Sequence, residues 1–256
     1  MWLVRTYSIC CDCHTWAKFS AAYTLVENDV KRGIPMSLTP IDFHSVVRSC
    51  IPQEAEVVVL QREGSPAAII YADVDGDGHP EITALYRYLD NQYLFSLKNY
   101  SGNWFPIASA ATGRTQTVTD FAAAPVSRRE GWDLVIGWQN ERESSSELDI
   151  VQWTPTGFQR LIPPGTIYNH LEIEDMPGRD GRDGLCEIAL WVHERDKVYH
   201  VETYRWDPYR LVPIQDVYSY YFQKVTRYYE DLTRDHPDEE AYRSYLEDAQ
   251  RKAGGS

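Results

Sequence analysis

Three similar stretches of sequence decide the fold: Glu81–Tyr86 (EITALY), Asp133–Trp138 (DLVIGW) and Glu187–Val192 (EIALWV). Each begins with an acidic residue and continues as an apolar run that ends in or near an aromatic residue. Short runs rich in branched and aromatic residues are typical of β-strands. Because the same pattern returns after about 50 residues, we interpret it as an internal structural repeat.

Each of these stretches is accompanied by three further predicted strands. The first strands are Ala67–Ala72, Thr115–Phe121 and Ile167–Ile173, the third strands are Tyr93–Tyr100, Glu147–Trp153 and Val198–Trp206, and the closing strands are Trp104–Ile107, Phe158–Ile162 and Tyr209–Val212. Four short strands per repeat, separated by turn residues, are typical of propeller blades. A β-sandwich whose strands happen to look alike is the alternative.

The sequence therefore predicts a mainly β protein with three propeller-like four-stranded blades and α-helices at both ends. Closed propellers have about 4–8 blades, so we expect an open or incomplete propeller. The predicted segments are a leader with helices over residues 1–52, three repeats over 53–213 (about 56–112, 113–164 and 165–213) and a helical hairpin over 214–256. An uncovered blade face would leave a large apolar patch, so we expect the flanking helices or a second copy of the chain, in a homodimer, to cover it.

The composition limits the classes of partner. The 256 residues include 25 Lys and Arg against 38 Asp and Glu, a formal net charge of −13 at pH 7. Proteins that follow a phosphate backbone need a basic surface, so this balance argues against a nucleic-acid partner. The sequence also lacks the run of about 18 apolar residues that a transmembrane helix requires, so we expect no transmembrane segment.

The loop after the first predicted strand of the first repeat carries an acidic motif, DVDGDGHPE at residues 73–81. Carboxylates at alternate positions of a tight loop, with glycines that let the backbone wrap, suit a hard cation such as Ca²⁺. The predicted ligands are Asp73, Asp75, Asp77, the backbone carbonyl of His79, and Glu81. Two observations oppose an EF-hand: Ala84 stands at the position of its bidentate Glu, and the flanking segments are β-rich. A solvated acidic turn is the alternative.

A strand, then Asp-x-Asp-x-Asp-Gly-x-x-acid, then a second apolar strand resembles the FG-GAP repeat of integrin alpha chains and the related VCBS repeats of bacterial surface proteins. The resemblance covers about residues 56–213. It implies one propeller-like blade per repeat, with Ca²⁺ held in the loop between the strands. It further implies a non-catalytic calcium-binding module that mediates protein interaction or adhesion, in an extracellular or cell-envelope location, although no clear signal peptide is present.

The other two repeats carry less complete loops. In the third repeat, Asp175, Asp180, Asp183 and Glu187 form a weaker candidate calcium site. In the second repeat, Asp133 is preceded by Arg128 and Arg129 instead of further acids. Since a guanidinium can neutralise a carboxylate without any metal, we expect one of these arginines to replace the cation there.

Both ends of the chain predict helices. Thr39 is a suitable N-cap for a helix that Pro52 ends. Apolar residues over 217–234 follow helical spacing, and Asp238 begins a second helix that ends at Gly254. This hairpin resembles one tetratricopeptide repeat. We expect it to cover the last blade, with a docking arm for another protein as the alternative.

The N-terminal cysteines Cys10, Cys11 and Cys13 form a tight cluster. Zinc sites commonly use two ligand pairs separated by a loop, and no second pair follows here. We therefore interpret this region as a leader or as the result of a translation start placed too far upstream.

No sequence motif for catalysis is present: no paired-histidine metalloprotease motif, nucleophile elbow or phosphate-binding loop. The sequence accordingly predicts a non-enzymatic protein whose partner is an unidentified protein or glycan. A carbohydrate-binding or carbohydrate-cleaving β protein is the alternative function, because aromatic residues are abundant and paired carboxylates are defined in space rather than in sequence.

Overall fold

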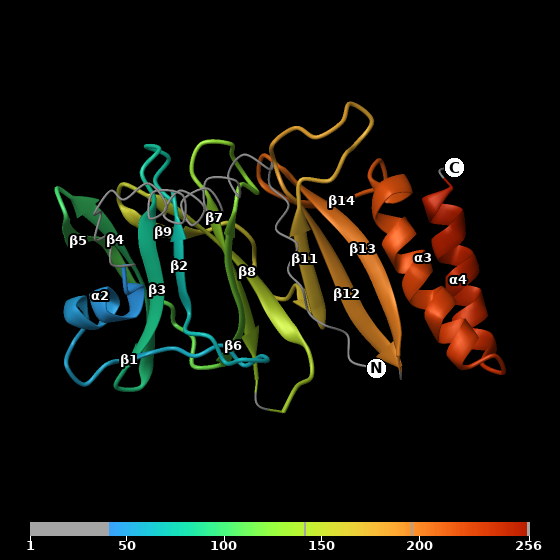
Figure 1. Cartoon of the computed structure of the whole chain (residues 1–256), viewed down its shortest axis with the longest axis horizontal. Coiled ribbons are helices and arrows are strands. Elements are labelled where there is room, and N and C mark those ends of the chain that lie inside the picture. Colours follow the sequence, from blue (N-terminus) through green and yellow to red (C-terminus); the bar gives the residue numbers. More distant parts are fainter. Residues whose placement is uncertain (1–40, 141, 196, 255–256) are drawn as a thin grey trace, which may run out of the picture.

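The computed structural model describes residues 41–254, apart from residues 141 and 196. The predictions for the leader and for the N-terminal cysteines fall outside this part. The described residues form a mainly β structure of three antiparallel sheets with three helices, as the sequence predicts (Figure 1).

The first sheet contains β1 (Glu56–Val57), β2 (Ile69–Ala72), β3 (Glu81–Tyr88), β4 (Asn91–Tyr100) and β5 (Asn103–Ala111). The second contains β6 (Thr117–Ala124), β7 (Asp133–Gln139), β8 (Ser146–Thr154), β9 (Gly157–Arg160) and β10 (Ile167–Tyr168). The third contains β11 (His170–Glu174), β12 (Glu187–Arg195), β13 (Val198–Asp207) and β14 (Arg210–Ile214). In each sheet four strands that follow one another in the chain pair as antiparallel neighbours.

One predicted strand is divided between two sheets. The sequence predicts a single strand over Ile167–Ile173, but its first two residues, β10, pair with β8 in the second sheet. Only the part from His170 onward, β11, joins the third sheet. The chain thereby crosses from one sheet to the next within the segment. In the first sheet, β1 and β2 both pair with the same side of β3, at different positions along it.

The sheets pack face to face in a row, and a helix covers each end of the row (Figure 1). Helix α2 (Phe43–Cys50) lies on the outer face of the first sheet, where Val47 packs among buried residues of β3 and β4. Helix α3 (Tyr218–Asp235) covers the outer face of the third sheet, and α4 (Glu240–Ala253) packs on α3. Within the described residues the row is open rather than closed into a ring.

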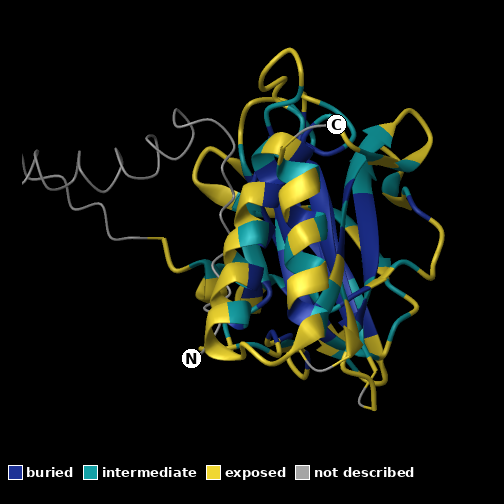
Figure 2. Ribbon diagram, turned by 90° about the vertical axis from the view of Figure 1, so that its right-hand side faces the viewer, coloured by how far each residue is buried: buried dark blue, intermediate teal, exposed yellow. Residues whose placement is uncertain are grey.

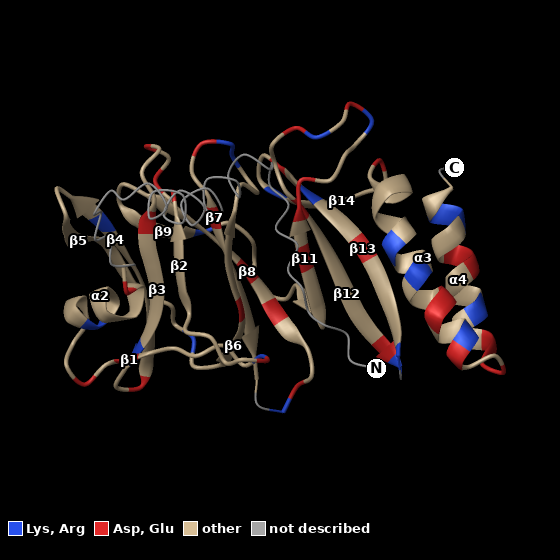
Figure 3. Ribbon diagram, viewed as in Figure 1, with Lys and Arg blue, Asp and Glu red and all other residues tan. Residues whose placement is uncertain are grey.

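This arrangement explains why the central strands lack an alternation of polar and apolar residues. The first six residues of β3 and of β7 are buried, and so are the first five residues of β12. They are buried because both faces of each sheet are covered (Figure 2). Strands buried on both faces require continuous apolar runs. Charged residues are frequent in the loops and on α3 and α4, and several lie on strands, among them β8, β11 and β13 (Figure 3).

The helices differ from their predicted starts. Asp42, not Thr39, is the N-cap of α2, because its carboxylate accepts the backbone N–H groups of His44 at 3.1 Å and Ser45 at 3.2 Å. At the C-terminus, α4 begins after Glu239, one residue beyond Asp238. No helix among the described residues is both long enough and apolar enough to cross a membrane.

Hydrogen bonds of tyrosine hydroxyls join the C-terminal helical hairpin to the third sheet. Trp191 on β12 donates its indole N–H to the Tyr221 hydroxyl at 2.7 Å. Tyr218 and Tyr220 of α3 donate to Glu202 and Glu174. The hairpin thus covers the apolar face of the last sheet, as expected for a helical cap.

Candidate metal centre

The acidic loop of the first repeat joins β2 to β3, and its own carboxylates stabilise its turns by accepting backbone N–H groups. Asp73 accepts the backbone N–H of Gly76 at 2.7 Å and of Gly78 at 2.9 Å, and both glycines have φ of +84°. Asp77 accepts the N–H of His79 at 2.9 Å. A side chain disfavours positive φ, which is why glycine suits both positions. The loop is therefore closed by its own hydrogen bonds.

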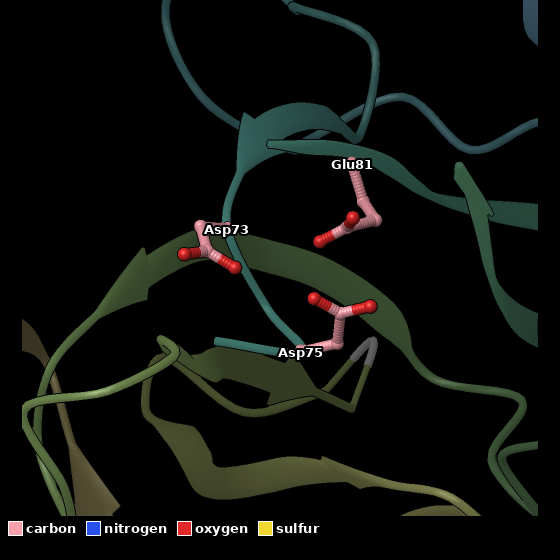
Figure 4. Close-up of side chains that lie close together, drawn as sticks. All are labelled: Asp73, Asp75 and Glu81. Carbon is pink, nitrogen blue, oxygen red and sulfur yellow. The ribbon is translucent and has the colours of Figure 1, made fainter. Parts of the chain in front are cut away.

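Three of the predicted ligands converge. Asp73, Asp75 and Glu81 each place one carboxylate oxygen within 4.8 Å of the other two (Figure 4). Oxygens that bind opposite sides of one Ca²⁺ at about 2.4 Å lie about this far apart. Asp77 belongs to the same cluster through a shared ion-pair partner. His79 is exposed at the turn, and the role of its carbonyl stays a prediction.

A lysine that the sequence analysis did not select lies in this cluster. The Lys98 ammonium, on β4, pairs with Asp75, with Asp77 at 2.8 Å and with Glu81 at 3.1 Å. Its side chain is only 10% exposed. Burial alone lowers the pKa of Lys98, but the three carboxylates together raise it above its usual value. Lys98 therefore stays charged at neutral pH and is an internal counter-cation for the loop.

One ammonium does not balance the loop. Four carboxylates, those of Asp73, Asp75, Asp77 and Glu81, face one positive charge, which leaves a formal charge of −3 when all are ionised. Glu81 is fully buried, and this burial raises the pKa of its carboxyl. Asp77 is the most open of the four, with 44% of its side chain exposed. The remaining negative charge favours a further cation.

The equivalent acid of the third repeat is paired with an arginine. Glu187 accepts a hydrogen bond from Arg205 Nε on β13 at 2.8 Å, and Arg205 also bonds to Asp216 at 3.0 Å. Asp175 accepts the N–H groups of Asp183 at 3.2 Å and Gly184 at 3.1 Å, in the manner of Asp73 in the first loop. The remaining candidate, Asp180, is exposed. Among the described residues, only the first loop gathers three acids tightly enough for one ion.

In the second repeat the acid is hydrogen-bonded by neutral donors and not, as expected, by an arginine. Asp133 accepts the Ser127 N–H at 2.6 Å and the Gln152 side-chain amide at 3.3 Å. Burial raises the pKa of Asp133, although the nearby charge of Arg128 lowers it in part. Arg128 itself donates to the Val74 carbonyl at 2.9 Å and so joins this loop to the first one. It bridges two loops and makes no hydrogen bond to the acid.

The three repeats share one buried arrangement. The acid that opens the second strand, Glu81, Asp133 or Glu187, accepts a backbone N–H from the preceding loop, donated by Val74, Ser127 or Met176. A side chain on the third strand faces the same acid. These side chains are Lys98, Gln152 and Arg205. The acid therefore anchors the loop in every repeat, and only its partner changes.

The chain matches no protein-family model, and a search of curated proteins found no significant match.

Proposed function

We propose that the chain is a non-catalytic module of three propeller-like blades whose first loop binds a divalent cation such as Ca²⁺. The convergence of Asp73, Asp75 and Glu81 within 4.8 Å carries this proposal. The cation would stabilise the loop, which lies against the second repeat. The module would present its outer loops and helices to a protein or glycan partner, as adhesion repeats at a bacterial cell envelope do.

Loop geometry and charge support the cation. The hydrogen bonds of Asp73 and Asp77 hold the turn in shape, so little of it has to be ordered on binding. The formal charge of −3 that remains after Lys98 is counted attracts a divalent ion strongly. The ammonium and the ion would compete for Asp75 and Glu81, so binding would move Lys98 away from at least one of them.

Contacts of the first loop with the second repeat would extend the effect of a bound ion to both repeats. The Asp73 carbonyl accepts the Trp132 N–H at 2.7 Å, and the Val74 carbonyl accepts from Arg128. An added Cβ on Gly76 would lie 3.1 Å from the Glu130 backbone. The first and second loops are therefore packed together, and an ion in one would stabilise the contact with the other.

Thermal unfolding of the chelator-treated protein, with and without CaCl₂, tests the proposal. At 100-fold excess over Kd, a ligand stabilises by about 2.7 kcal/mol, which raises Tm by about 5–10 °C for a protein of this size. Asp75→Asn should abolish most of the rise. Asp90→Asn, an exposed acid at the β3–β4 turn, should leave it unchanged. If calcium at about 10 mM does not shift the wild-type Tm, the proposed ion site is wrong.

Two further measurements address the partner. A glycan array in calcium distinguishes a glycan from a protein partner, and light scattering measures the oligomeric state. Helix α2 packs on the outer face of the first sheet and α3 on that of the third, so the scattering measurement tests whether the surface left open supports a homodimer.

A further inference from the structure

The first sheet ends in a long edge strand, β5, which pairs with β4 on one side and with no described strand on the other (Figure 1). Alternate backbone N–H and C=O groups of an edge strand point away from its neighbour and can pair with a further strand. β5 has nine residues, whereas β9 and β14, the closing strands of the other two sheets, have four and five. Of the three closing strands, β5 therefore leaves the longest edge.

The β5 edge carries no charge. None of its residues is Asp, Glu, Lys or Arg, whereas β9 contains Arg160 and β14 contains Arg210. The only charged residue of the neighbouring β4 is Lys98, whose ammonium is paired within the acidic loop. Charged side chains, above all Lys, are a common means by which proteins prevent their edge strands from pairing with another chain. β5 lacks this protection.

Two features protect the first half of β5 but not the second. Pro106 has no backbone N–H to donate. The register with β4 shifts at Ile107, which marks a bulge. From Ala108 to Ala111 the register is regular again. The part of the edge that is open to pairing is therefore the segment Ala108–Ala111, whose side chains are all small.

The surroundings of β5 leave this edge accessible within the described residues. Helix α2 packs on the face of the sheet, where Trp104 belongs to the cluster beneath it, and no backbone hydrogen bond joins α2 to β5. At the β4–β5 turn, Tyr100 and Phe105 are half exposed, and their ring centroids lie 6.1 Å apart. Exposed aromatic side chains beside an unpaired edge add apolar area to a contact made there.

The composition of the open segment favours a second copy of the chain over an unrelated peptide. A peptide that adds to a sheet edge is recognised through pockets for its alternate side chains, and alanine and serine form no such pockets. A two-fold axis repeats every contact instead, so a second copy requires no pocket. The chain carries a formal net charge of −13, so two copies repel each other. This repulsion is smallest where the approaching surfaces are uncharged, as they are at β5.

We propose that β5 pairs antiparallel with β5 of a second copy, about a two-fold axis within Ala108–Ala111, so that the two first sheets form one continuous sheet. Small side chains then lie opposite small side chains, and Phe105 of each copy lies beyond the end of the paired segment. The contact is a strand edge and not the uncovered sheet face that the sequence predicts. It does not involve the acidic loop, so this proposal and the cation proposal can fail separately.

Sedimentation velocity of the whole chain, from about 1 to about 500 µM, tests the proposal. A contact smaller than about 1,200 Å² is weak, so we expect a dimer with a micromolar Kd. Ser109→Lys changes an exposed residue of the open segment and brings two ammonium groups together near the axis. It should raise Kd at least about tenfold, because like charges opposite each other destabilise a strand pair. Gln159→Lys adds the same charge at an exposed position of β9 and should leave Kd unchanged.

Hydrogen exchange of the wild type locates the contact without any variant. The amides of Ala108–Ala111 should exchange more slowly at about 500 µM than at about 5 µM, while those of β9 should not change. Circular dichroism verifies that both variants fold. If the wild type is monomeric at the highest concentration, if both variants dimerise equally well, or if the protected amides lie outside β5, the proposal is wrong.

Discussion

Replacing Lys98 with methionine tests the description of the acidic loop most directly. Methionine keeps much of the aliphatic stem but removes the ammonium that pairs with Asp75, Asp77 and Glu81. The fully buried Glu81 would keep only the Val74 N–H as a hydrogen-bond donor among the described residues. The variant therefore isolates the contribution of the internal cation.

The magnitude follows from the exposure of the partners. Removing one member of a buried ion pair costs about 3–5 kcal/mol because a buried charge is left uncompensated. Asp77 is 44% exposed, and water screens its share of the interaction. We therefore expect Lys98→Met to lower the free energy of unfolding by about 2–4 kcal/mol at pH 7 without calcium.

The pH dependence gives a second readout with a defined sign. Burial raises the pKa of Glu81 in the folded state, so folding disfavours its ionised form. The cost of ionising Glu81 in the folded protein is absent below the pKa that Glu81 has in the unfolded chain. It grows as the pH rises toward the higher pKa of the folded state, and it is complete above that value. Without the ammonium the folded pKa of Glu81 rises further. The loss caused by Lys98→Met should therefore be smaller at about pH 4.5 than at pH 7.

Urea unfolding followed by far-UV circular dichroism measures both effects. Lys197→Met removes an exposed ammonium from the β12–β13 turn and should cost less than about 0.5 kcal/mol. Calcium should restore more stability to Lys98→Met than to the wild type, because the ammonium no longer competes for the carboxylates. If Lys98→Met and the wild type unfold at the same urea concentration with equal slopes, Lys98 is not the counter-cation of the loop.

Three further variants test other parts of the structure by the same unfolding measurement. Asp133→Asn removes an acid whose pKa is raised by burial. As the pH rises from about 4 to 7, the stability of this variant relative to the wild type should therefore increase, and a decrease would contradict the cost of burying the charged acid. Gly137→Ala would place a Cβ 2.0 Å from the Tyr168 hydroxyl and should cost about 1–3 kcal/mol, a loss that Tyr168→Phe in the same chain should partly relieve. Tyr221→Phe removes the acceptor of the Trp191 N–H and should cost about 1–3 kcal/mol, and an unchanged stability would show that the hairpin does not depend on this bond.

Much of the strand order could be predicted from the sequence because the repeat unit contains its own pairing information. The runs at Glu81, Asp133 and Glu187 begin β3, β7 and β12 in the structure. Turn residues between successive strands predict hairpins, and hairpins in series give antiparallel neighbours. The exceptions are local. The division of Ile167–Ile173 between two sheets depends on which neighbour each half meets, and this is a tertiary property.

The candidate ligands were predictable for the same local reason. Asp73, Asp75 and Glu81 lie within nine residues, so the turn alone brings them together. Lys98 is on a different strand, and nothing in its own surroundings in the sequence distinguishes it from other lysines. Only the register of β3 and β4, in which Ile82 pairs with Leu97, places Lys98 beside Glu81.

The register in the other repeats shows what the opening acid does. Leu134 pairs with Val151, which puts Gln152 beside Asp133, and Ile188 pairs with Tyr204, which puts Arg205 beside Glu187. The side chain that faces the acid is thus a cation in the first and third repeats and a neutral amide in the second. A backbone N–H of the preceding loop is bonded to the acid in all three repeats. An acid whose only role was to bind metal would not require this amide in a repeat that lacks the other ligands. We infer that the buried acid anchors the loop in every repeat, and that the proposed ion in the first repeat would add to this structural role.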